Sequence, residues 1–544
     1  MSENLIYKVV LFVLLSIPGS VFCQNHWYWI GFTDKDDSPF KIEDPTSYLS
    51  KKTIDKRKKF NIPVDTYDIP VNQKYIDSIK NLGFNIMYSL KWFNGVVAET
   101  EDTELFNLLN NIGFIREVKL IAAADGYKSF SNKFKTEEEP DTEFQNSFTQ
   151  IEQVNGFYLH NKGYKGKDKV IGVFDAGFYH VDSLEPFKQL WENGQILGYR
   201  DYARSGTDFF EHNWHGMAVL SVMAGDIPGY LTGTAPEAGY WLLRTEVVAY
   251  EQYIEEYNWA AAAEFADSIG IDLINSSLGY SLFDAPFTDY SYGDMDGKTA
   301  VSSKAAAMAA RKGILVIVSA GNEGNDPWQY ITAPSDADSV LAAGAIDGSG
   351  NYAYFSSIGP SADNRVKPDV MTQGMSVTLV NYDEQIGANN GTSFSAPVLT
   401  GMAASLWQAF PDASNIDIIR AIQRSADRYS DPDDFYGYGI PDFEKAYAIL
   451  AKKLEDDQED IKIYSDELTG NVKLIVLCDE PENITIEVFD LQGKRHLLKS
   501  KVSEAYYNEM EIDLSSLNSG IYFIRVSLPG HVSKTLKTVK ITSY

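Results

Sequence analysis

Gly391-Thr-Ser-Phe-Ser-Ala-Pro397 is the stretch on which the interpretation of this chain depends. Small residues surround Ser393, and an apolar run from Pro397 to Phe410 that is typical of a helix follows. A serine hydroxyl is a weak nucleophile until an adjacent base takes its proton. Upstream, Asp175 ends an apolar run, and His215 precedes a glycine. Asp, then His, then Ser is one of the chain orders in which nucleophilic triads occur.

Four residues form a candidate catalytic set. Ser393 is the expected nucleophile, and His215 is the expected general base, which later protonates the leaving amine. Asp175 is expected to orient the imidazole and to stabilise its charged form. Asn322 follows Ala320-Gly321 at the end of another apolar run. Its amide is expected to donate to the oxyanion together with the backbone N–H of Ser393.

Residue type alone leaves two alternatives. Ser395 lies two residues after Ser393, and His212 lies three residues before His215. Small residues at 395 and 396 favour close packing of a helix, and the His-Gly step favours His215. Each of the four candidates has an ordinary structural explanation when taken singly, so the hypothesis depends on their occurring together and in order.

The middle of the chain alternates strand-like and helix-like runs. The apolar strand-like runs are 170–174, 271–275 and 314–318, and the helix-like runs between them are 252–268 and 301–312. This alternation predicts an α/β fold, a parallel sheet with helices on both faces. Such sheets bind ligands beyond the carboxyl ends of their strands. Asp175, Ser277-Leu278-Gly279 and Gly321-Asn322 all fall at predicted strand ends.

The flanking regions have different patterns. Residues 25–125 contain strand patterns at 27–32, 84–100 and 115–122 and helical patterns at 73–81 and 103–111, which indicates a small α+β unit. After an acidic hinge at 455–460, alternation at 472–476, 484–488 and 520–526 predicts a small β-sandwich. The expected division is therefore a signal peptide at 1–23, an α+β domain at 24–125, an acidic linker at 126–147, an α/β domain at 148–455 and a β-sandwich at 456–544.

The first residues have the pattern of a secretory signal. Lys8 precedes an apolar stretch, Val9 to Pro18, and a cut is expected between Cys23 and Gln24. The stretch is too short to span a bilayer. The alternatives are a membrane anchor and a lipidated Cys23, although the bulky Phe22 disfavours lipidation.

Charge and cysteine content exclude several classes of function. A net charge of -29 would repel nucleic-acid phosphates, so no nucleic-acid partner is expected. The two cysteines are Cys23 and Cys478, so loss of the signal leaves no intramolecular disulfide. Seven scattered histidines and one remaining cysteine supply no cluster with metal-ligand spacing, and no cofactor or metal site is assigned.

The quoted motifs resemble those of the subtilisin-like serine peptidases, the subtilases, over residues 150–450. Two positions depart from the usual family pattern: Ala176 stands in the Asp motif and Met217 in the His motif. The resemblance implies that Ser277, Leu278, Gly279, Ala320 and Gly321 bind the substrate backbone and form the walls of the pocket for the residue before the scissile bond. Many subtilases bind structural calcium, but no loop here is assigned as a ligand set.

Both flanks also resemble companions of that family. Residues 25–125 resemble a subtilase propeptide, a domain that assists folding and inhibits the enzyme until it is cut away. The run from Asp513 to Val526 is similar to C-terminal sorting domains of the type IX secretion route in Bacteroidetes. The alternative for this last region is an accessory binding module.

These features together predict a secreted or cell-surface serine endopeptidase that is made as a zymogen. Its expected partners are protein or peptide substrates, its own propeptide as an intramolecular inhibitor, and the outer-membrane secretion machinery. The alternative is a catalytically inactive subtilase scaffold that serves as a surface binding protein. That alternative predicts the loss of a catalytic residue, and all four candidates are present; Ala176 and Met217 are the features that favour it.

Overall fold

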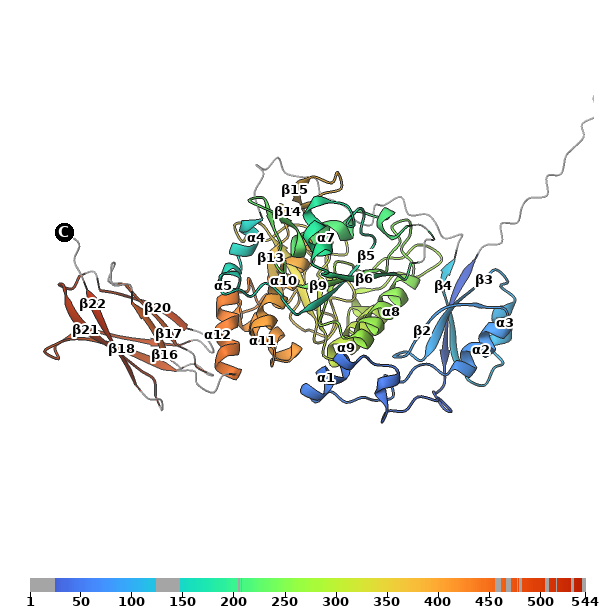
Figure 1. The fold of residues 1–544 in the computed structure, drawn as a ribbon, viewed down its shortest axis with the longest axis horizontal. Helices are drawn as coiled ribbons and strands as arrows, with labels where there is room; N and C mark the ends of the chain where they lie inside the picture. The colour runs from blue at the N-terminus through green and yellow to red at the C-terminus, as the bar shows by residue number, and fades with distance from the viewer. Residues whose placement is uncertain are drawn as a thin grey trace, which may run out of the picture.

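A computed structural model describes residues 25–123, 147–203, 206, 208–454, 461–465, 471–476, 478, 482–503, 508–514, 516–529 and 533–540. The expected signal peptide, nearly all of the acidic linker and the acidic hinge at 455–460 lie outside these residues. The described chain forms an N-terminal α+β unit, a central α/β unit and a C-terminal pair of antiparallel sheets (Figure 1). This architecture confirms the predicted fold class. None of the described helices combines the length and apolar character needed to cross a membrane.

The N-terminal unit is a four-stranded antiparallel sheet in the order β2-β3-β1-β4. Its strands are β1 (His26–Phe32), β2 (Asn85–Leu90), β3 (Gly95–Thr100) and β4 (Ile115–Ala123), and its helices are η1 (Pro45–Ser47), α1 (Lys51–Lys59), α2 (Gln73–Asn81) and α3 (Leu105–Leu109). The strand pattern expected over 84–100 is two strands, and α1 was not expected from the sequence.

Strand β1 has apolar side chains on both of its faces, and the N-terminal sheet is buried on both sides as a result. Tyr28, Ile30 and Phe32 point into the unit's own core. Trp29 points the other way, because successive side chains of a strand alternate, and its ring lies 5.2 Å from that of Tyr257 on α8. The sheet therefore packs its second face against the central unit.

The central unit is a seven-stranded sheet in the order β13-β12-β11-β10-β5-β9-β6, and every neighbouring pair is parallel. Its strands are β5 (Val170–Asp175), β6 (Ile196–Asp201), β9 (Gly239–Arg244), β10 (Leu273–Ser276), β11 (Leu315–Ser319), β12 (Leu341–Ile346) and β13 (Val370–Gln373). Two small hairpins pair β7 (Asp226–Ile227) with β8 (Leu231–Thr232) and β14 (Val377–Val380) with β15 (Ile386–Asn389).

Helices cover both faces of this sheet. The longer ones are α7 (His215–Ala224), α8 (Ile254–Ile269), α9 (Val301–Arg311), α10 (Thr392–Ala409), α11 (Asn415–Ser425) and α12 (Phe443–Leu454), and the shorter ones are α4 (Phe148–Glu152), α5 (Phe157–Asn161), η3 (Glu185–Phe187), α6 (Lys188–Glu192), η4 (Phe209–Glu211) and η5 (Tyr292–Asp294). The apolar residues of α7 and α10 belong to one core cluster, and those of α8 and α9 belong to the other.

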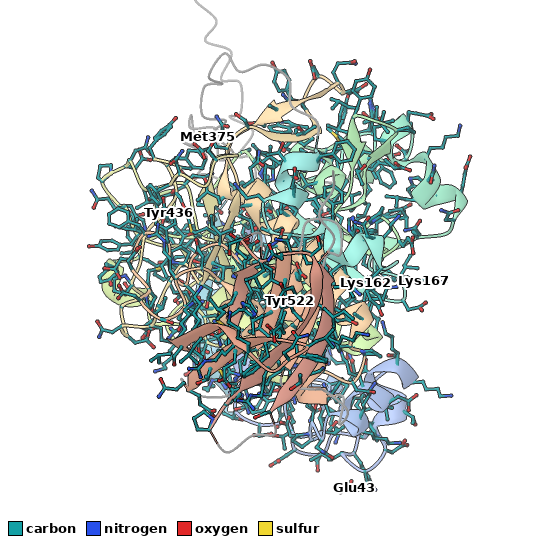
Figure 2. The ribbon with its side chains drawn as sticks, turned by 90° about the vertical axis from the view of Figure 1, so that its left-hand side faces the viewer. Glu43, Lys162, Lys167, Met375, Tyr436 and Tyr522 are labelled. Atoms are coloured by element: carbon teal, nitrogen blue, oxygen red, sulfur yellow. The ribbon has the colours of Figure 1, made fainter. Side chains whose placement is uncertain are left out.

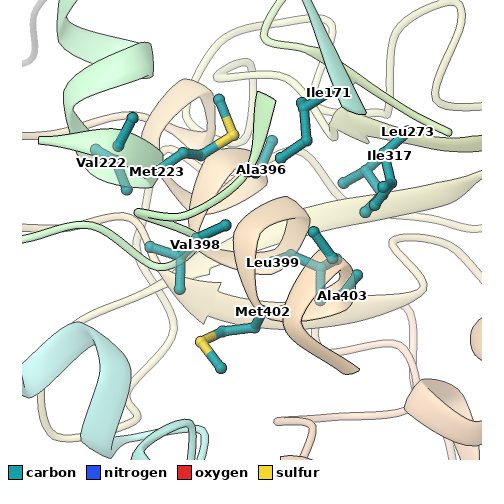
Figure 3. Packing of buried hydrophobic residues seen from close by; sticks show 14 of the residues in the cluster. Ile171, Val222, Met223, Leu273, Ile317, Ala396, Val398, Leu399, Met402 and Ala403 are labelled. Atoms are coloured by element: carbon teal, nitrogen blue, oxygen red, sulfur yellow. The ribbon is translucent and has the colours of Figure 1, made fainter. Parts of the chain in front are cut away.

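Helix α10 is buried along almost its whole length at the centre of the first core. Figure 3 shows Ala396, Leu399 and Ala403 of this helix packed among Ile171, Leu273 and Ile317, which come from three adjacent strands. A helix that is apolar on all sides is expected in such a position. The helix begins at Thr392, five residues before the run anticipated from the sequence, so Ser393 lies in its first turn.

The C-terminal unit is a sandwich of two antiparallel sheets, in the orders β16-β17-β20 and β19-β18-β21-β22. The strands are β16 (Ile461–Ser465), β17 (Asn471–Val476), β18 (Asn483–Asp490), β19 (Arg495–Val502), β20 (Asn508–Asp513), β21 (Gly520–Ser527) and β22 (Lys534–Lys540). One core cluster takes residues from both sheets. Seen from this end of the molecule, the sandwich with Tyr522 lies in front of the central unit (Figure 2).

A buried charge network joins α1 of the N-terminal unit to α8 and α9. Arg57 donates to Asp68 at 2.6 and 2.8 Å and to Asp267 at 2.8 and 2.9 Å. Lys91 pairs with Asp267 at 3.2 Å, and Lys312 pairs with Asp68 at 3.0 Å. Although burial opposes it, the bonds from Arg57 hold the pKa of Asp68 down at about 2. Two buried carboxylates therefore share one guanidinium, and each also pairs with one lysine.

We expect the substitution Arg57→Leu to destabilise the uncut chain, because it leaves Asp68 and Asp267 buried beside fewer cations. Breaking a buried pair costs about 3–5 kcal/mol. The matched control is Lys59→Leu, which removes an exposed pair with Asp412 and should cost under about 1 kcal/mol. Urea unfolding of both variants measures the difference, and equal midpoints would contradict it.

Candidate active site

The carboxyl ends of three adjacent strands of the central sheet come together at one edge. In the parallel register, Ser276 of β10 lies beside Phe174 of β5 and beside Val318 of β11. Asp175 and Ser277 are the next residues along their chains, so both lie at this edge of the sheet. The loop after β11, which begins at Ala320, starts at the same level. The sequence-predicted site residues therefore converge on one end of the sheet.

Asp175 and His215 form a buried pair at this edge. The Nδ1 atom of His215 lies 2.8 Å from Oδ1 of Asp175 and 3.1 Å from Oδ2. Asp175 is fully buried and His215 is 3% exposed. Burial raises the pKa of the Asp175 carboxyl, whereas His215 and the backbone N–H of Ala176, at 2.7 Å, favour its ionised form. Ala176 thus supports the carboxylate through its backbone, which most residue types could do.

The close approach of α7 to β5 requires the glycine that follows His215. A Cβ on Gly216 would lie 2.3 Å from the carbonyl oxygen of Gly177 and 2.8 Å from the Cβ of Asp175. No side chain fits there, so the His-Gly step is a packing requirement for bringing the imidazole to the carboxylate. Met217, the next residue, is fully buried in the core.

Ser393 is held by an exchange of bonds with Ser277. The Ser277 hydroxyl donates to the Ser393 carbonyl oxygen at 2.7 Å, and the Ser393 hydroxyl lies 3.5 Å from the Ser277 carbonyl oxygen. In a regular helix, that carbonyl would accept from the residue four positions later, but Pro397 has no N–H. The Ser277 hydroxyl therefore supplies the donor that the proline removes. This hydrogen bond between Ser277 and Ser393 was not predicted from the sequence. The feature that could have indicated it is Pro397, a residue without an N–H in an apolar helical run.

The structure distinguishes the candidates from their sequence neighbours. The hydroxyl of Ser395 is fully buried and donates to the carbonyl oxygen of Thr392 at 2.8 Å, within α10. The bond to Asp175 comes from His215, whereas His212 lies before the start of α7. The His215 ring lies 5.8 Å from that of Phe394. His215 thus lies beside the first turn of α10, where Ser393 is found.

Asn322 is oriented by the start of α10. Its Oδ1 atom accepts from the backbone N–H and from the hydroxyl of Thr392, both at 2.8 Å. Because a backbone N–H can only donate, these bonds fix which end of the amide is the oxygen. The Nδ2 group consequently lies on the other side, 3.5 Å from where a Cβ on Gly391 would stand. It can donate to a group bound beside the first turn of α10.

Arg244 also contacts this edge of the sheet, and the sequence did not predict that it belongs to the site. Its Nε donates to the carbonyl oxygen of Ala176 at 2.9 Å, and its Nη1 contacts Asp201 at 3.0 and 3.2 Å. Arg244 is 4% exposed. The guanidinium therefore ties the turn that follows Asp175 to strand β6.

Among the described residues, one group of acidic side chains is close enough to hold a cation. The carboxylates of Glu246, Glu251 and Glu255 offer oxygens within 4.8 Å of one another. Several of these oxygens already accept hydrogen bonds, from the Tyr280 hydroxyl and from the backbone N–H groups of Val247 and Gln252. These bonds give the group a structural explanation without a metal.

Comparisons with known protein families identify the three parts of the chain. Residues 166–439 match the subtilase family, and residues 27–139 match the Peptidase S8 propeptide domain of Bacteroidota. Residues 465–541 match a secretion system C-terminal sorting domain. The chain belongs to the subtilase family and is a subtilisin-like serine protease with a propeptide domain. Its sorting domain marks it for secretion or display at the cell surface.

Individual relatives are distant. Subtilisin NAT of Bacillus subtilis subsp. natto is 28% identical over 296 residues, which cover 53% of this chain and 68% of that protein. Serine protease AprX of Bacillus subtilis is 27% identical over 317 residues, which cover 52% and 66% respectively. The crystal structure of MycP1 from Mycobacterium smegmatis matches with a TM-score of 0.45 and 20% identity, covering 57% of this chain and 87% of that one.

The link between Ser277 and Ser393 predicts a double-mutant result. Ser277→Ala should lower the free energy of unfolding by about 1–3 kcal/mol, because it leaves a buried carbonyl without a donor. Adding Pro397→Ala restores an N–H four residues after Ser393 and should recover most of that loss. Urea unfolding of the two single variants and the double variant measures the coupling. Strictly additive effects would contradict the link.

Proposed function

We propose that this protease is a secreted endopeptidase in which Ser393 attacks the peptide carbonyl and His215 accepts the serine proton. His215 then donates that proton to the leaving amine, and a water molecule repeats the cycle on the acyl-enzyme. Asp175 orients the imidazole and stabilises its charged form. The Nδ2 group of Asn322 and the backbone N–H of Ser393 donate to the oxyanion.

The observation that carries this proposal is the buried bond between His215 Nδ1 and Asp175. When Nδ1 carries the proton that it donates to a carboxylate, the neutral imidazole leaves Nε2 as an acceptor. An acceptor beside the first turn of α10 can receive the proton of Ser393. In that first turn the Thr392 N–H donates to Asn322 and the Phe394 N–H donates to the carbonyl oxygen of Gly391, and the positive end of the helix dipole favours developing negative charge.

The two loop segments at the sheet edge are proposed as the substrate-binding walls. Ser277, Leu278 and Gly279 extend β10, and Ala320 and Gly321 extend β11. Leu278 and Ala320 are buried, whereas Gly279 is exposed and Gly321 is half-buried. A substrate chain can therefore reach the backbone groups of both segments from solvent.

The N-terminal unit is proposed as the intramolecular inhibitor of this site. The carboxylate of Glu264 on α8 accepts from the backbone N–H groups of Lys91 and Trp92, at 2.7 and 2.8 Å. The last described residue of the unit, Ala123, exchanges two bonds of 3.2 Å with the side chain of Gln252. Gln252 lies on the loop after β9, whose carboxyl end is at the catalytic edge. The last described residue of the propeptide domain thus contacts the loop that follows the carboxyl end of β9.

A fluorophosphonate probe tests the nucleophile directly. We expect one covalent adduct on the trimmed wild-type chain and none on Ser393→Ala, with Ser395→Ala labelled like the wild type. Intact mass spectrometry measures the adduct. On a peptide substrate, Ser393→Ala should lower kcat by about 10⁶, and Asn322→Ala should lower it by about 10²–10³.

The same experiment separates the proposal from an inactive binding scaffold. A correctly trimmed and folded wild-type chain that forms no adduct would refute the catalytic proposal. An adduct that persists in Ser393→Ala would leave a serine protease but would show that a different nucleophile operates.

The inhibitory contact predicts a pH dependence. Burial raises the pKa of Glu264 to about 7 in the uncut chain, against the opposing influence of Lys91, Lys35 and the two backbone N–H groups. When the propeptide leaves, this carboxyl meets water and should return towards its ordinary value of 4.5. The complex then binds a proton more tightly than the free enzyme does, so proton uptake favours the complex at low pH.

We therefore expect the cut propeptide to bind more weakly as the pH rises from about 4.5 through 7. The expected change is up to about two orders of magnitude in the dissociation constant. The dissociation constant is measured from the inhibition of peptide hydrolysis by the propeptide that stays bound after the cut. The complex is diluted at a series of pH values between 5 and 8, and the recovery of activity is followed at each. Glu264→Gln should flatten this profile, and the remote exposed Glu192→Gln should leave it unchanged. An unaltered profile in Glu264→Gln would contradict the assignment.

A further inference from the structure

Arg244, the last residue of β9, lies between two acidic residues of the central sheet. In the parallel register it is opposite Asp175 of β5 on one side and opposite Asp201 of β6 on the other. Its buried guanidinium donates to the carbonyl oxygen of Ala176 at 2.9 Å and to Asp201 at 3.0 and 3.2 Å. A planar guanidinium holds its donors in a fixed fork. These bonds therefore set the position of the Ala176 carbonyl relative to the edge strand β6.

The peptide unit between Asp175 and Ala176 is fixed by the end of β9. The backbone N–H of Thr245 donates to the Asp175 carbonyl oxygen at 3.0 Å, and Arg244 holds the next carbonyl along the chain. In a planar trans peptide, the N–H points away from the C=O of the same unit. The Ala176 N–H therefore points away from β9, and it donates to Oδ1 of Asp175 at 2.7 Å.

The same turn packs against the segment that leads into α7. A Cβ on Gly177 would lie 2.4 Å from the backbone nitrogen of Asn213, so the two backbones lie in close contact. The side chain of Asn213 in turn accepts from the backbone N–H of His215 at 2.8 Å. A shift of the turn would therefore move the carboxylate of Asp175 and the imidazole of His215 relative to each other.

The orientation of this turn matters because Asp175 is fully buried. Burial raises the pKa of its carboxyl, and the bond from the Ala176 N–H acts in the opposite direction. A buried carboxylate needs such donors in order to remain charged. Alanine has no side-chain donor, so residue 176 supports the carboxylate through its backbone alone, and the backbone must be held in the correct orientation.

We propose that Arg244 is a positioning residue for the catalytic reaction. It acts through the Ala176 peptide and fixes the orientation in which the Asp175 carboxylate meets His215. Because the charge of the guanidinium is paired with Asp201, Arg244 acts by geometry more than by charge. This inference rests on the proposed function, in which Asp175 orients the imidazole, and it adds Arg244 and Asp201 as the residues that orient Asp175.

Peptide hydrolysis by the trimmed enzyme tests the inference. Arg244→Met should lower kcat by about 10²-fold, the effect of a small misplacement of a catalytic group. It should leave KM within about twofold, because the contact acts on the transition state. Arg200→Met is the matched control: Arg200 is exposed on β6, where its guanidinium lies over the rings of Tyr202 and Phe265, and its loss should leave kcat unchanged. Active molecules are counted with the fluorophosphonate probe. An Arg244→Met enzyme with the wild-type kcat would overturn the proposal.

Proton NMR of the uncut Ser393→Ala chain tests the same inference without requiring activity. The Nδ1 proton of His215, hydrogen-bonded to Asp175, should give a far-downfield signal, which is assigned by its loss in His215→Gln. Arg244→Met should shift or broaden this signal, because the carboxylate is no longer held in place, and Arg200→Met should leave it unchanged. An unaltered signal in Arg244→Met would show that Arg244 does not orient the pair.

A second variant keeps the test decisive if Arg244→Met does not fold. Arg244→Lys retains a cation beside Asp201 but lacks the fork of donors, so it should lower kcat by a smaller factor and should still shift the signal. Wild-type values of both quantities in Arg244→Lys would refute the role of Arg244. A trimmed wild-type chain that is neither labelled nor active would refute the catalytic proposal instead, and the NMR comparison would still decide whether Arg244 orients Asp175.

Discussion

The parallel register of β5, β10 and β11 is the constraint on which the rest of the site depends. It brings Asp175, Ser277 and Ser319 to one level at one sheet edge, although these residues are far apart in the sequence. Helix α10 packs against the same three strands through its apolar side chains, so its first turn meets that edge as well (Figure 3). The core that stabilises the fold is therefore the same contact that positions Ser393. A substitution that shifted α10 in the core would move the proposed nucleophile.

At this edge of the sheet, the hydrogen bonding of the first turn of α10 departs from that of a regular helix. Pro397 interrupts the hydrogen bonding of α10, and the freed carbonyl of Ser393 accepts from Ser277 instead. That bond ties the start of the helix to the loop after β10. Asn322 ties the same turn to the loop after β11 through Thr392. The first turn of α10 is thus fixed from both sides by loops that are themselves proposed to hold substrate, so the nucleophile and the substrate-binding walls share one framework.

The sequence predicted the elements whose signals are local. Continuous apolar runs identified β5, β10 and β11, and the run from Pro397 to Phe410 identified helix α10, although its start was placed five residues too late. Contacts between distant residues were not predictable in this way. Helix α1 is short and strongly basic, and its stabilising partners, Asp267 and Asp272, lie more than 200 positions away.

The N-terminal unit is held at both edges of the central sheet. At the amino edge, Lys56 donates to the carbonyl oxygen of Ile271, just before β10, and Arg57 reaches Asp267. At the carboxyl edge, Ala123 is bonded to Gln252. Cutting the chain between these two units breaks none of these contacts. A buried charge network is costly to open, because the ions lose their partners before they regain water. If the propeptide domain inhibits the site as proposed, its cleavage and its release are therefore separate events, and the interface, more than the cut itself, determines when the proposed active-site edge becomes free.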